Sequence, residues 1–460
     1  MTSNPDANSI PWWRHMNRYH WFVFLVASLA WVFDCLDQQI FILARNSAMK
    51  ALMMAGTDPG AIKVAGTMAT AIFVAGWATG GLIFGAVGDR IGRARTLTLT
   101  VLMYSLFTGL SAFSTSVQMF EVFRFITGLG VGGVFGLSVA LVADSLPDQA
   151  RPHALGLLQA LSAVGNVTAG LIGIFVGWLE TTHIKPGSAW SYMFMVGALP
   201  AFLCVFIQMR LKEPEKWVKA RAAGKVTGVR FGSYFSLLGD ARWRSRALIG
   251  MLLCVSAVVG LWGIAFFSPE LTNDVIGRIL KGEGVSAEKL PGYRTMWTGL
   301  TSVIQNLGAF AGMLTFTKMA HKYGRKPAFA VGFFCAMVST MVVFKFLNSK
   351  SDIFWMIPMM GFFQLGIFAG FAIYLPELFP VSLRSTGTSF CYNVGRFIAA
   401  GGPFIMGELT KNLGAGATTP EAKLNAFRNA CCWTSLIFLL GLAALPFLPE
   451  TKGKPLPEDA

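Results

Sequence analysis

The feature that most constrains this chain is a series of apolar segments, each long enough to cross a lipid bilayer. A transmembrane helix needs about 20 mostly apolar residues. Charged residues make up 13% of the sequence, roughly half of what a soluble globular protein carries. The sequence therefore predicts an all-α membrane protein with twelve transmembrane helices. The expected spans are 21–44, 66–88, 96–115, 119–142, 154–178, 190–210, 247–269, 297–317, 327–347, 353–375, 386–408 and 427–447.

The charges between the spans predict how the chain lies in the membrane. Residues 210–246 hold ten Lys and Arg residues against three acids, and Lys and Arg are enriched in cytoplasmic loops. We therefore expect this central linker and both termini to be cytoplasmic, in the cell's inner (plasma) membrane. The same rule accounts for the net charge of +15, so the bilayer is the expected surrounding and no nucleic-acid partner is needed.

Two short motifs occur twice at one fixed distance. Gly92 and Gly324 lie 232 positions apart (324 − 92), in the sequences DRIGR and HKYGR. Asp144 and Glu377 lie 233 positions apart (377 − 144), and each is followed by Pro three positions later and by Arg seven positions later. A constant offset indicates internal duplication, which is common in transporters. The expected units are a six-helix bundle at 1–210, a basic linker at 211–246 and a second six-helix bundle at 247–460.

The joint after the second span carries a recognisable motif. Gly85-x-x-x-Asp89-Arg90-x-Gly92-Arg93 resembles the loop signature of the major facilitator superfamily. The segment Glu121-x-x-Arg124-x-x-x-Gly128-x-Gly130-x-Gly132 is similar to the fourth-helix signature of that superfamily. With the duplicated joints, the resemblance covers essentially the whole chain. It implies two pseudo-symmetric bundles that rock about a central cavity.

The duplicated joints are the expected gating elements. A carboxylate at Asp89 can pair with arginines on its own joint and accept hydrogen bonds from a nearby helix N-terminus. Such a contact can hold one conformation and break in the other. The second copy has His321 in the place of Asp89, so we expect a weaker or different contact there. The gating residues are Gly85, Asp89, Arg90, Gly92, Arg93, Asp144, Arg151, Gly324, Arg325, Glu377 and Arg384.

Charged residues within the spans are expensive and suggest function. Asp34 and Asp37 share one face of the first span, where mutual repulsion and desolvation both favour a protonated carboxyl. Asp37 and Arg124 lie at a similar depth, counting about 1.5 Å per residue, so an ion pair is within reach. Glu121 lies one turn from Arg124. We therefore expect proton coupling at Asp34, Asp37, Glu121 and Arg124. Arg124 could serve structure, coupling or substrate binding. A purely structural role for the two aspartates is the alternative.

Arg396 lies near the middle of its span, and no acid is close to it in the same helix. A guanidinium in that position suits a carboxylate ligand, which it can hold through two hydrogen bonds. A partner from another helix is the alternative. Polar and aromatic side chains in other spans are supporting candidates. The expected substrate-binding residues are Arg124, Arg396, Gln38, Asn166, Trp262, Phe266, Gln305, Gln364, Tyr392 and Asn393, and Gln159 and Asn306 are further candidates.

Within the superfamily, Asp34-x-x-Asp37 is similar to the Asp-Gly-x-Asp signature of proton symporters for aromatic acids and sialic acid. Gly395-Arg396 resembles the eleventh helix of the same group. The resemblance implies a proton site at the two aspartates and a substrate near Arg124 and Arg396. The chain departs from the signature at Cys35. The expected function is import of a small organic anion, such as an aromatic or sugar acid, with protons by alternating access in a monomer.

Two other transport functions are considered. Pro214-Glu215 and Pro449-Glu450 look like joints of sugar porters, but the Gln-Gln pair expected in the seventh span is absent, and a neutral sugar would leave Arg396 without a partner. An exporter of small amphipathic compounds would favour a wide apolar cavity without buried arginines. An enzyme is not expected, because the five histidines lie at membrane edges and form no metal or catalytic cluster. We expect no metal and no cofactor.

Overall fold

The computed structural model describes residues 11–54, 56–182, 189–196, 210–262, 268–285, 290–400, 402–416 and 418–458, and the regular elements in these ranges are all helical. A short 3-10 helix, η2, precedes the first long helix. The helices of the first half are η2 (Trp12–His15), α1 (Arg18–Leu52), α2 (Pro59–Ile91), α3 (Arg93–Ser111), α4 (Val117–Ser145), α5 (Arg151–Ala160), α6 (Ser162–Thr182) and α7 (Ala189–Val196).

Two short helices form the central linker, and the second half follows. The linker helices are α9 (Glu215–Thr227) and α10 (Tyr234–Gly239). The second half contains α11 (Ala241–Trp262), α12 (Ser268–Gly282), α13 (Leu290–Tyr323), α14 (Arg325–Phe346), α15 (Lys350–Leu378), η4 (Val381–Leu383), α16 (Arg384–Ala400), α17 (Gly402–Leu413), α18 (Pro420–Thr434), η5 (Ser435–Ile437), α19 (Phe438–Ala444) and η6 (Leu445–Phe447).

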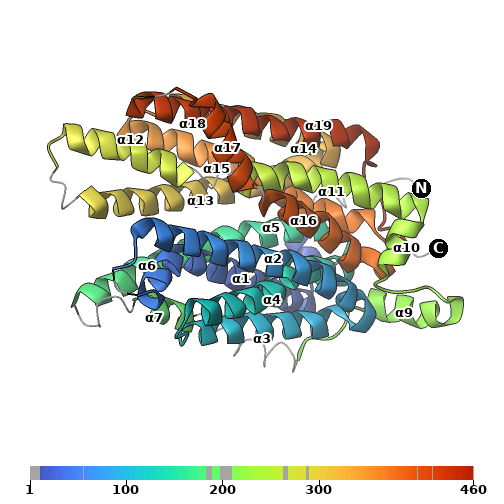
Figure 1. Ribbon diagram of the computed structural model, residues 1–460. Coiled ribbons are helices and arrows are strands. Elements are labelled where there is room, and N and C mark those ends of the chain that lie inside the picture. Colours follow the sequence, from blue (N-terminus) through green and yellow to red (C-terminus); the bar gives the residue numbers. More distant parts are fainter. Residues whose placement is uncertain are drawn as a thin grey trace.

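The two halves form two layers of roughly aligned helices. Figure 1 shows the blue-to-green helices of the first half in one layer and the yellow-to-red helices of the second half in the other. Both termini lie at the end of the molecule that carries α9 and α10, as an even number of spans requires. We call this end the linker end. Helices α2 and α16 and helices α5 and α13 pack against each other across the two layers.

Eight helices in the described part of the chain are long and apolar enough to cross a membrane. They correspond to eight of the twelve predicted spans. The spans expected at 96–115, 297–317 and 386–408 fall on α3, on α13 and on the pair α16–α17. The span expected at 190–210 begins in α7, and residues 197–209 lie outside the described residues. Helix α16 is polar because it is internal: Ser385, Thr386, Thr388 and Ser389 are all buried. The stretch between the seventh and eighth expected spans contains a further helix, α12, and the first residues of α13.

The two copies of the joint motif share one local structure. Gly92 and Gly324 begin α3 and α14 with φ of +123° and +107°, a backbone conformation that favours glycine. The Glu213 carboxylate accepts hydrogen bonds of 3.2 and 3.1 Å from two backbone N–H groups in the first turn of α3. The Glu450 carboxylate accepts two of 3.0 Å at the start of α14. Burial alone would raise the pKa of Glu450, but backbone N–H donors lower it.

We expect Gly92→Ala to destabilise the protein more than the matched change Gly228→Ala. Both glycines have positive φ, so each alanine costs about 1 kcal/mol of backbone strain. A Cβ on Gly92 would also lie 2.3 Å from Glu213 Oε1, whereas nothing lies within 4 Å of a Cβ on Gly228. Disruption of the two hydrogen bonds to Glu213, one part-buried and one exposed, should bring the total for Gly92→Ala to about 2 kcal/mol. Thermal unfolding in detergent measures the difference, and equal losses would contradict the role of Glu213.

Candidate functional site

Arg396 lies between the two halves, enclosed by aromatic rings. Its guanidinium carbon is 3.8 Å from the ring centroid of Trp77 on α2 and 4.2 Å from that of Tyr392 on its own helix, α16. Arg396 Nη1 donates to Asn393 Oδ1 at 2.7 Å. Burial between two rings in this way strengthens a cation–π interaction, because the charge has lost its water. The arginine is thus fixed in position by one helix from each half.

The rings around Arg396 are held by close packing of the helices. The ring of Tyr392 stacks on that of Phe135 from α4, with centroids 4.1 Å apart, and Phe135 also contacts Trp31. A Cβ on Gly81 would lie 2.1 Å from the amide of Asn393. Glycine at this position therefore lets α2 approach α16 closely enough for the Asn393 side chain to reach Arg396.

Asp34 faces this arginine from the first half. Its carboxylate is buried and accepts a hydrogen bond of 3.0 Å from Gln38 Nε2. Asp34 and Arg396 interact electrostatically. Within the described residues, Asp34 Oδ1 and Arg396 Nε have no hydrogen-bond partner. Buried polar atoms in native proteins are nearly always paired, so a free acceptor and a free donor on either side of one interface mark a place where a ligand or proton can bind.

Asp37 and Arg124 form a second charged pair, which lies inside the first half. Arg124 Nη1 is 4.0 Å from Asp37 Oδ1, and both side chains are buried. Arg124 also donates to Ser111 Oγ and lies over the rings of three phenylalanines, Phe41, Phe120 and Phe194. All of these contacts come from α1, α3, α4 and α7. The structure therefore brings Arg124 to Asp37, as the depth comparison predicted, and into an enclosed position apart from the aromatic cluster at Arg396.

Glu121 is not part of this pair. It lies half-buried one turn before Arg124, and no ion pair involving it occurs in the part of the chain that the structure describes. A carboxyl on the same helix face as a buried arginine need not contact it, because the arginine extends towards α1 and α3 instead.

The other candidate polar residues lie elsewhere in the molecule. Asn166 Nδ2 donates to Asn306 Oδ1 at 3.0 Å, which joins α6 to α13 across the two halves. Gln364 bonds to Thr340 within the second half. Gln305 lies on α13 against α15, where its backbone contacts Gly361. Further placements complete the set: Gln159 is buried on α5, and Phe266 and the side chain of Trp262 lie outside the described residues.

At the linker end, Asp89 joins the halves. Arg93 Nη2 lies 3.0 Å from Asp89 Oδ1. The same carboxylate accepts hydrogen bonds from the backbone N–H groups of Ser385 and Thr386 at 3.2 and 2.8 Å, and from Thr386 Oγ1 at 2.7 Å. These donors are the first turn of α16, so a carboxylate of the first half caps a helix of the second half. Gly85, one turn earlier, lies directly against Ser389 of α16.

Asp144 makes the second contact between the halves at this end. Its carboxylate is 2.9 Å from Arg93 Nε of the first half and also pairs with Arg384 Nη1 of the second half. All three side chains are fully buried. Arg93 Nη2 also donates to the carbonyl of Val381 at 2.6 Å. Three of the predicted gating residues of the first half, Asp89, Arg93 and Asp144, thus form one network with the start of α16. Arg90 is exposed and lies outside this network.

The second copy of the network is built differently. Arg325 holds Glu377 through two hydrogen bonds of 3.0 and 2.7 Å, as Arg93 holds Asp144. Arg151 occupies the place of Arg384 but pairs with Asp148 at the protein surface. Glu377 accepts its other hydrogen bond from Thr451 at 2.6 Å. Among the described residues, the second copy therefore has no ion pair between the halves that corresponds to Asp144–Arg384.

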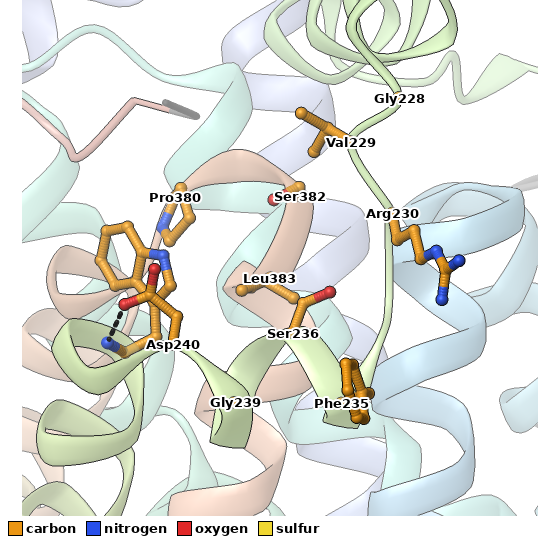
Figure 2. A pocket seen from close by; sticks show the side chains of 11 residues that line it. Gly228, Val229, Arg230, Phe235, Ser236, Gly239, Asp240, Pro380, Ser382 and Leu383 are labelled. Carbon is orange, nitrogen blue, oxygen red and sulfur yellow. Dashed lines mark hydrogen bonds between the residues drawn. The ribbon is translucent and has the colours of Figure 1, made fainter.

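A surface hollow of about 610 Å³ lies at the linker end, between the linker and the joint after α15 (Figure 2). Its walls come from residues between Gly228 and Trp243 and from Pro380, Ser382 and Leu383. Its one acid, Asp240, accepts a hydrogen bond of 3.3 Å from the backbone N–H of Trp243 and so caps α11. No group of three potential metal ligands occurs in the described part of the chain. The hollow offers no paired acid and base, and the candidate site remains the cluster at Arg396.

The sequence reasoning missed the residues that hold Arg396 in place. Trp77 and Phe135 read as ordinary apolar residues of a span, because their role depends on helix packing. One signal was available: Trp77 lies within the segment Gly76-Trp77-Ala78-Thr79-Gly80-Gly81, and small residues spaced along a membrane helix mark a face where another helix approaches closely.

Comparisons with known proteins show what this chain is similar to. The family model described as Major Facilitator Superfamily matches residues 21–278, and the model described as Sugar (and other) transporter matches residues 228–459. The cis,cis-muconate transport protein of Acinetobacter baylyi is 29% identical over 84% of this chain and 86% of that protein. The sialic acid transporter NanX of Escherichia coli is 25% identical over 88% of this chain and 91% of that protein.

A solved structure shares the fold. The proton:xylose symporter XylE bound to 6-bromo-6-deoxy-D-glucose matches with a TM-score of 0.71 and 18% identity, over 95% of this chain and 98% of that one. This likeness confirms the predicted fold class. The family matches confirm the resemblance that the joint and fourth-helix motifs predicted.

We expect Asp144→Asn to lower the stability of the protein far more than Asp148→Asn. The two changes are chemically identical and four residues apart, but Asp144 is fully buried between two arginines and Asp148 is 64% exposed. Removing one partner of a buried ion pair costs about 3 to 5 kcal/mol, whereas exposed pairs contribute less than about 1 kcal/mol. Thermal unfolding of both variants in one detergent compares them. Similar losses would mean that the Asp144 pairs are not needed to hold the linker end together.

Proposed function

This chain belongs to the major facilitator superfamily of membrane transporters, and we propose that it imports a small organic anion together with protons by alternating access. Like the other members of its family, it is a transporter and not an enzyme. The proposed substrate is a carboxylate such as an aromatic acid or a sugar acid. We further propose that the protein works as a monomer in the inner membrane, with the linker end in the cytoplasm.

The observation that carries this proposal is the buried guanidinium of Arg396 with its unpartnered Nε. The two rings and Asn393 fix the guanidinium while leaving one donor unused. A carboxylate that accepts from Nε would satisfy this donor and supply the missing countercharge. A planar acid could also lie against the ring surfaces that already enclose the arginine. A neutral sugar offers no countercharge, so it suits this position less well.

The relatives fit this substrate class. Muconate and sialic acid, named for two of the relatives, both carry carboxylates. The xylose symporter and the sugar-transporter family model keep a neutral sugar as the second candidate. The observation that favours the anion over the sugar is again the buried positive charge, because a negative group offsets the desolvation of that charge better than a neutral one does.

The two aspartates of α1 are the proposed proton site. Asp34 faces Arg396, and Asp37 faces Arg124. We propose that protonation from the outside weakens these attractions, which frees Arg396 to hold the incoming anion. Anion and proton then cross together with little net charge, and loss of the proton to the cytoplasm restores the Asp34–Arg396 attraction and releases the anion. The coupling is thus a competition between an internal carboxylate and the substrate carboxylate for one arginine.

We expect Arg396→Lys to transport poorly and Arg396→Ala not to bind the anion. Lysine keeps the charge but loses the planar fork and the stacking between two rings, so affinity should fall about 10- to 100-fold. Proteoliposome uptake of labelled cis,cis-muconate, benzoate and N-acetylneuraminate under an inward proton gradient measures this, with D-xylose as the neutral comparison. Unchanged affinity in Arg396→Ala, or accumulation of xylose alone, would contradict the anion proposal.

We expect Asp34→Asn to abolish proton-driven accumulation while exchange of labelled for unlabelled substrate continues. The amide resembles the protonated carboxyl in shape and charge, so substrate binding remains but no proton can be carried. The matched variant Asp352→Asn, at the half-buried N-terminal cap of α15 outside the site, should retain both activities. If Asp34→Asn still concentrates substrate against a gradient, the proton is carried elsewhere.

A further inference from the structure

Two histidines occupy the positions that correspond, by the internal duplication, to the contact between Asp89 and the start of α16. In the first copy, Asp89 of one half accepts hydrogen bonds from Thr386 of the other. His321 lies 232 positions after Asp89 (321 − 89), and His153 lies 233 positions before Thr386 (386 − 153). The rings of His153 and His321 are in contact, with centroids 4.4 Å apart and planes tilted by 55°. The duplication thus places an imidazole pair where its counterpart has a carboxylate and a hydroxyl.

We infer that His153 and His321 form a proton-sensitive contact, which helps to hold the linker end closed while both imidazoles are neutral and weakens as the pH on that side falls. The inference goes beyond the proposed transport reaction, because it concerns a second group of titrating residues outside the substrate path. It does not depend on which substrate is carried.

Whether a proton on an imidazole favours opening depends on the groups across the interface, because only their distance from that imidazole changes when the halves separate. Across the interface from His153, the second half contributes His321 and Arg325. Arg325 and Lys452 also act on His321, but they belong to its own half and stay with it. A protonated His153 would therefore meet His321 and a guanidinium, and all three charges would have the same sign. The carboxylate nearest to Arg325 is Glu377, which Arg325 already holds.

The groups on the same side as each imidazole stay with it in both conformations. The ring of Trp12 stacks on His153 with centroids 5.8 Å apart, and a cation–π interaction there would favour a protonated His153. Trp12 belongs to the first half, however, so this preference is the same whether the linker end is open or closed. Other charged residues near the pair are Arg14 and His15 on η2, Asp148 and Arg151 at the start of α5, Lys318 and Lys322 on α13, Lys326 on α14, and Glu450, whose carboxylate caps α14.

The sign of the pH dependence follows from these contacts. In the closed arrangement, a proton on His153 would lie against the ring of His321 and near the guanidinium of Arg325, both of which belong to the other half. When the halves separate, an ordinary histidine titrates near pH 6.5. Closure is therefore unopposed above about pH 7 and is increasingly opposed as the pH falls below about 6.5. Each unit by which closure lowers a pKa changes the ratio of open to closed molecules by about tenfold at low pH. His321 is exposed, so protons can reach the pair from solvent.

The test measures opening directly, without substrate. Spin labels at Arg95→Cys and Tyr323→Cys, both exposed and one in each half at the linker end, report their separation in lipid nanodiscs at pH 8.0 and pH 5.5. Carboxylates also titrate in this range. The change in open population is therefore compared between the labelled protein with both histidines, called the parent, and the same protein with H153Q/H321Q. We expect the open population of the parent to rise about three- to tenfold more than that of the double variant. The control H20Q, at the cap of α1, should respond like the parent.

A second variant should reverse the direction in which lowering the pH shifts the open population. H321D restores the aspartate of the first copy, and a protonated His153 would then face a carboxylate. Lowering the pH from 8.0 to 6.0 should therefore close the linker end of H321D while it opens that of the parent. The inference is overturned if the double variant responds like the parent, or if H321D opens as the parent does. Because no transport is measured, these outcomes are independent of whether the proposed substrate class is right.

Discussion

The buried carboxylate of Asp144 is the interaction on which the closed linker end depends. It contacts Arg93 in its own half and Arg384 in the other, and none of the three side chains reaches solvent. Attraction between such charges compensates for their lost hydration only while all of them stay together. If the halves part by the width of one water molecule, hydration replaces the attraction. The contact therefore favours two discrete arrangements, closed and dry or open and hydrated, over a gradual opening.

The duplication sets the positions of the functional groups but not their chemistry. Asp34, Asp37 and Arg124 belong to the first half, whereas Arg396 belongs to the second. Within the described residues, the ion pair between halves at the linker end also comes from the first copy of the motif, through Asp144. In our proposal, proton binding and anion binding are thus divided between two bodies, and neither half alone could couple them. Coupling then follows from the attraction between Asp34 on α1 and Arg396 on α16. Gly81 on α2 lets α16 approach closely enough to reach this position.

The fold and part of the site were predictable from the sequence because they follow from local pattern. Span length, loop charge and the constant offset of the joints identify the architecture, and one turn of separation was enough to place Asp34 and Asp37 on one face. The depth comparison also brought Asp37 to Arg124. Trp77 and Phe135 were missed, since nothing local distinguishes a ring that holds an arginine from one that faces lipid. Glu121 was chosen for its position one turn from Arg124 and Gln364 for its residue type, and the packing of α4 and α15 places neither of them in the cluster at Arg396.

The chain that connects the halves is hydrogen-bonded to both of them. Trp217 and Tyr234 of the linker donate hydrogen bonds to the carbonyls of Asp89 and Leu82 in the first half, while Gly232 N–H donates to the carbonyl of Ser382 in the second. Gly232 and Tyr234 are only two residues apart, so this short segment is bound to both halves at once. If the halves separate at this end, as the proposed cycle requires, the segment must give up its hydrogen bonds to one of them, and the linker then contributes directly to the free energy of opening.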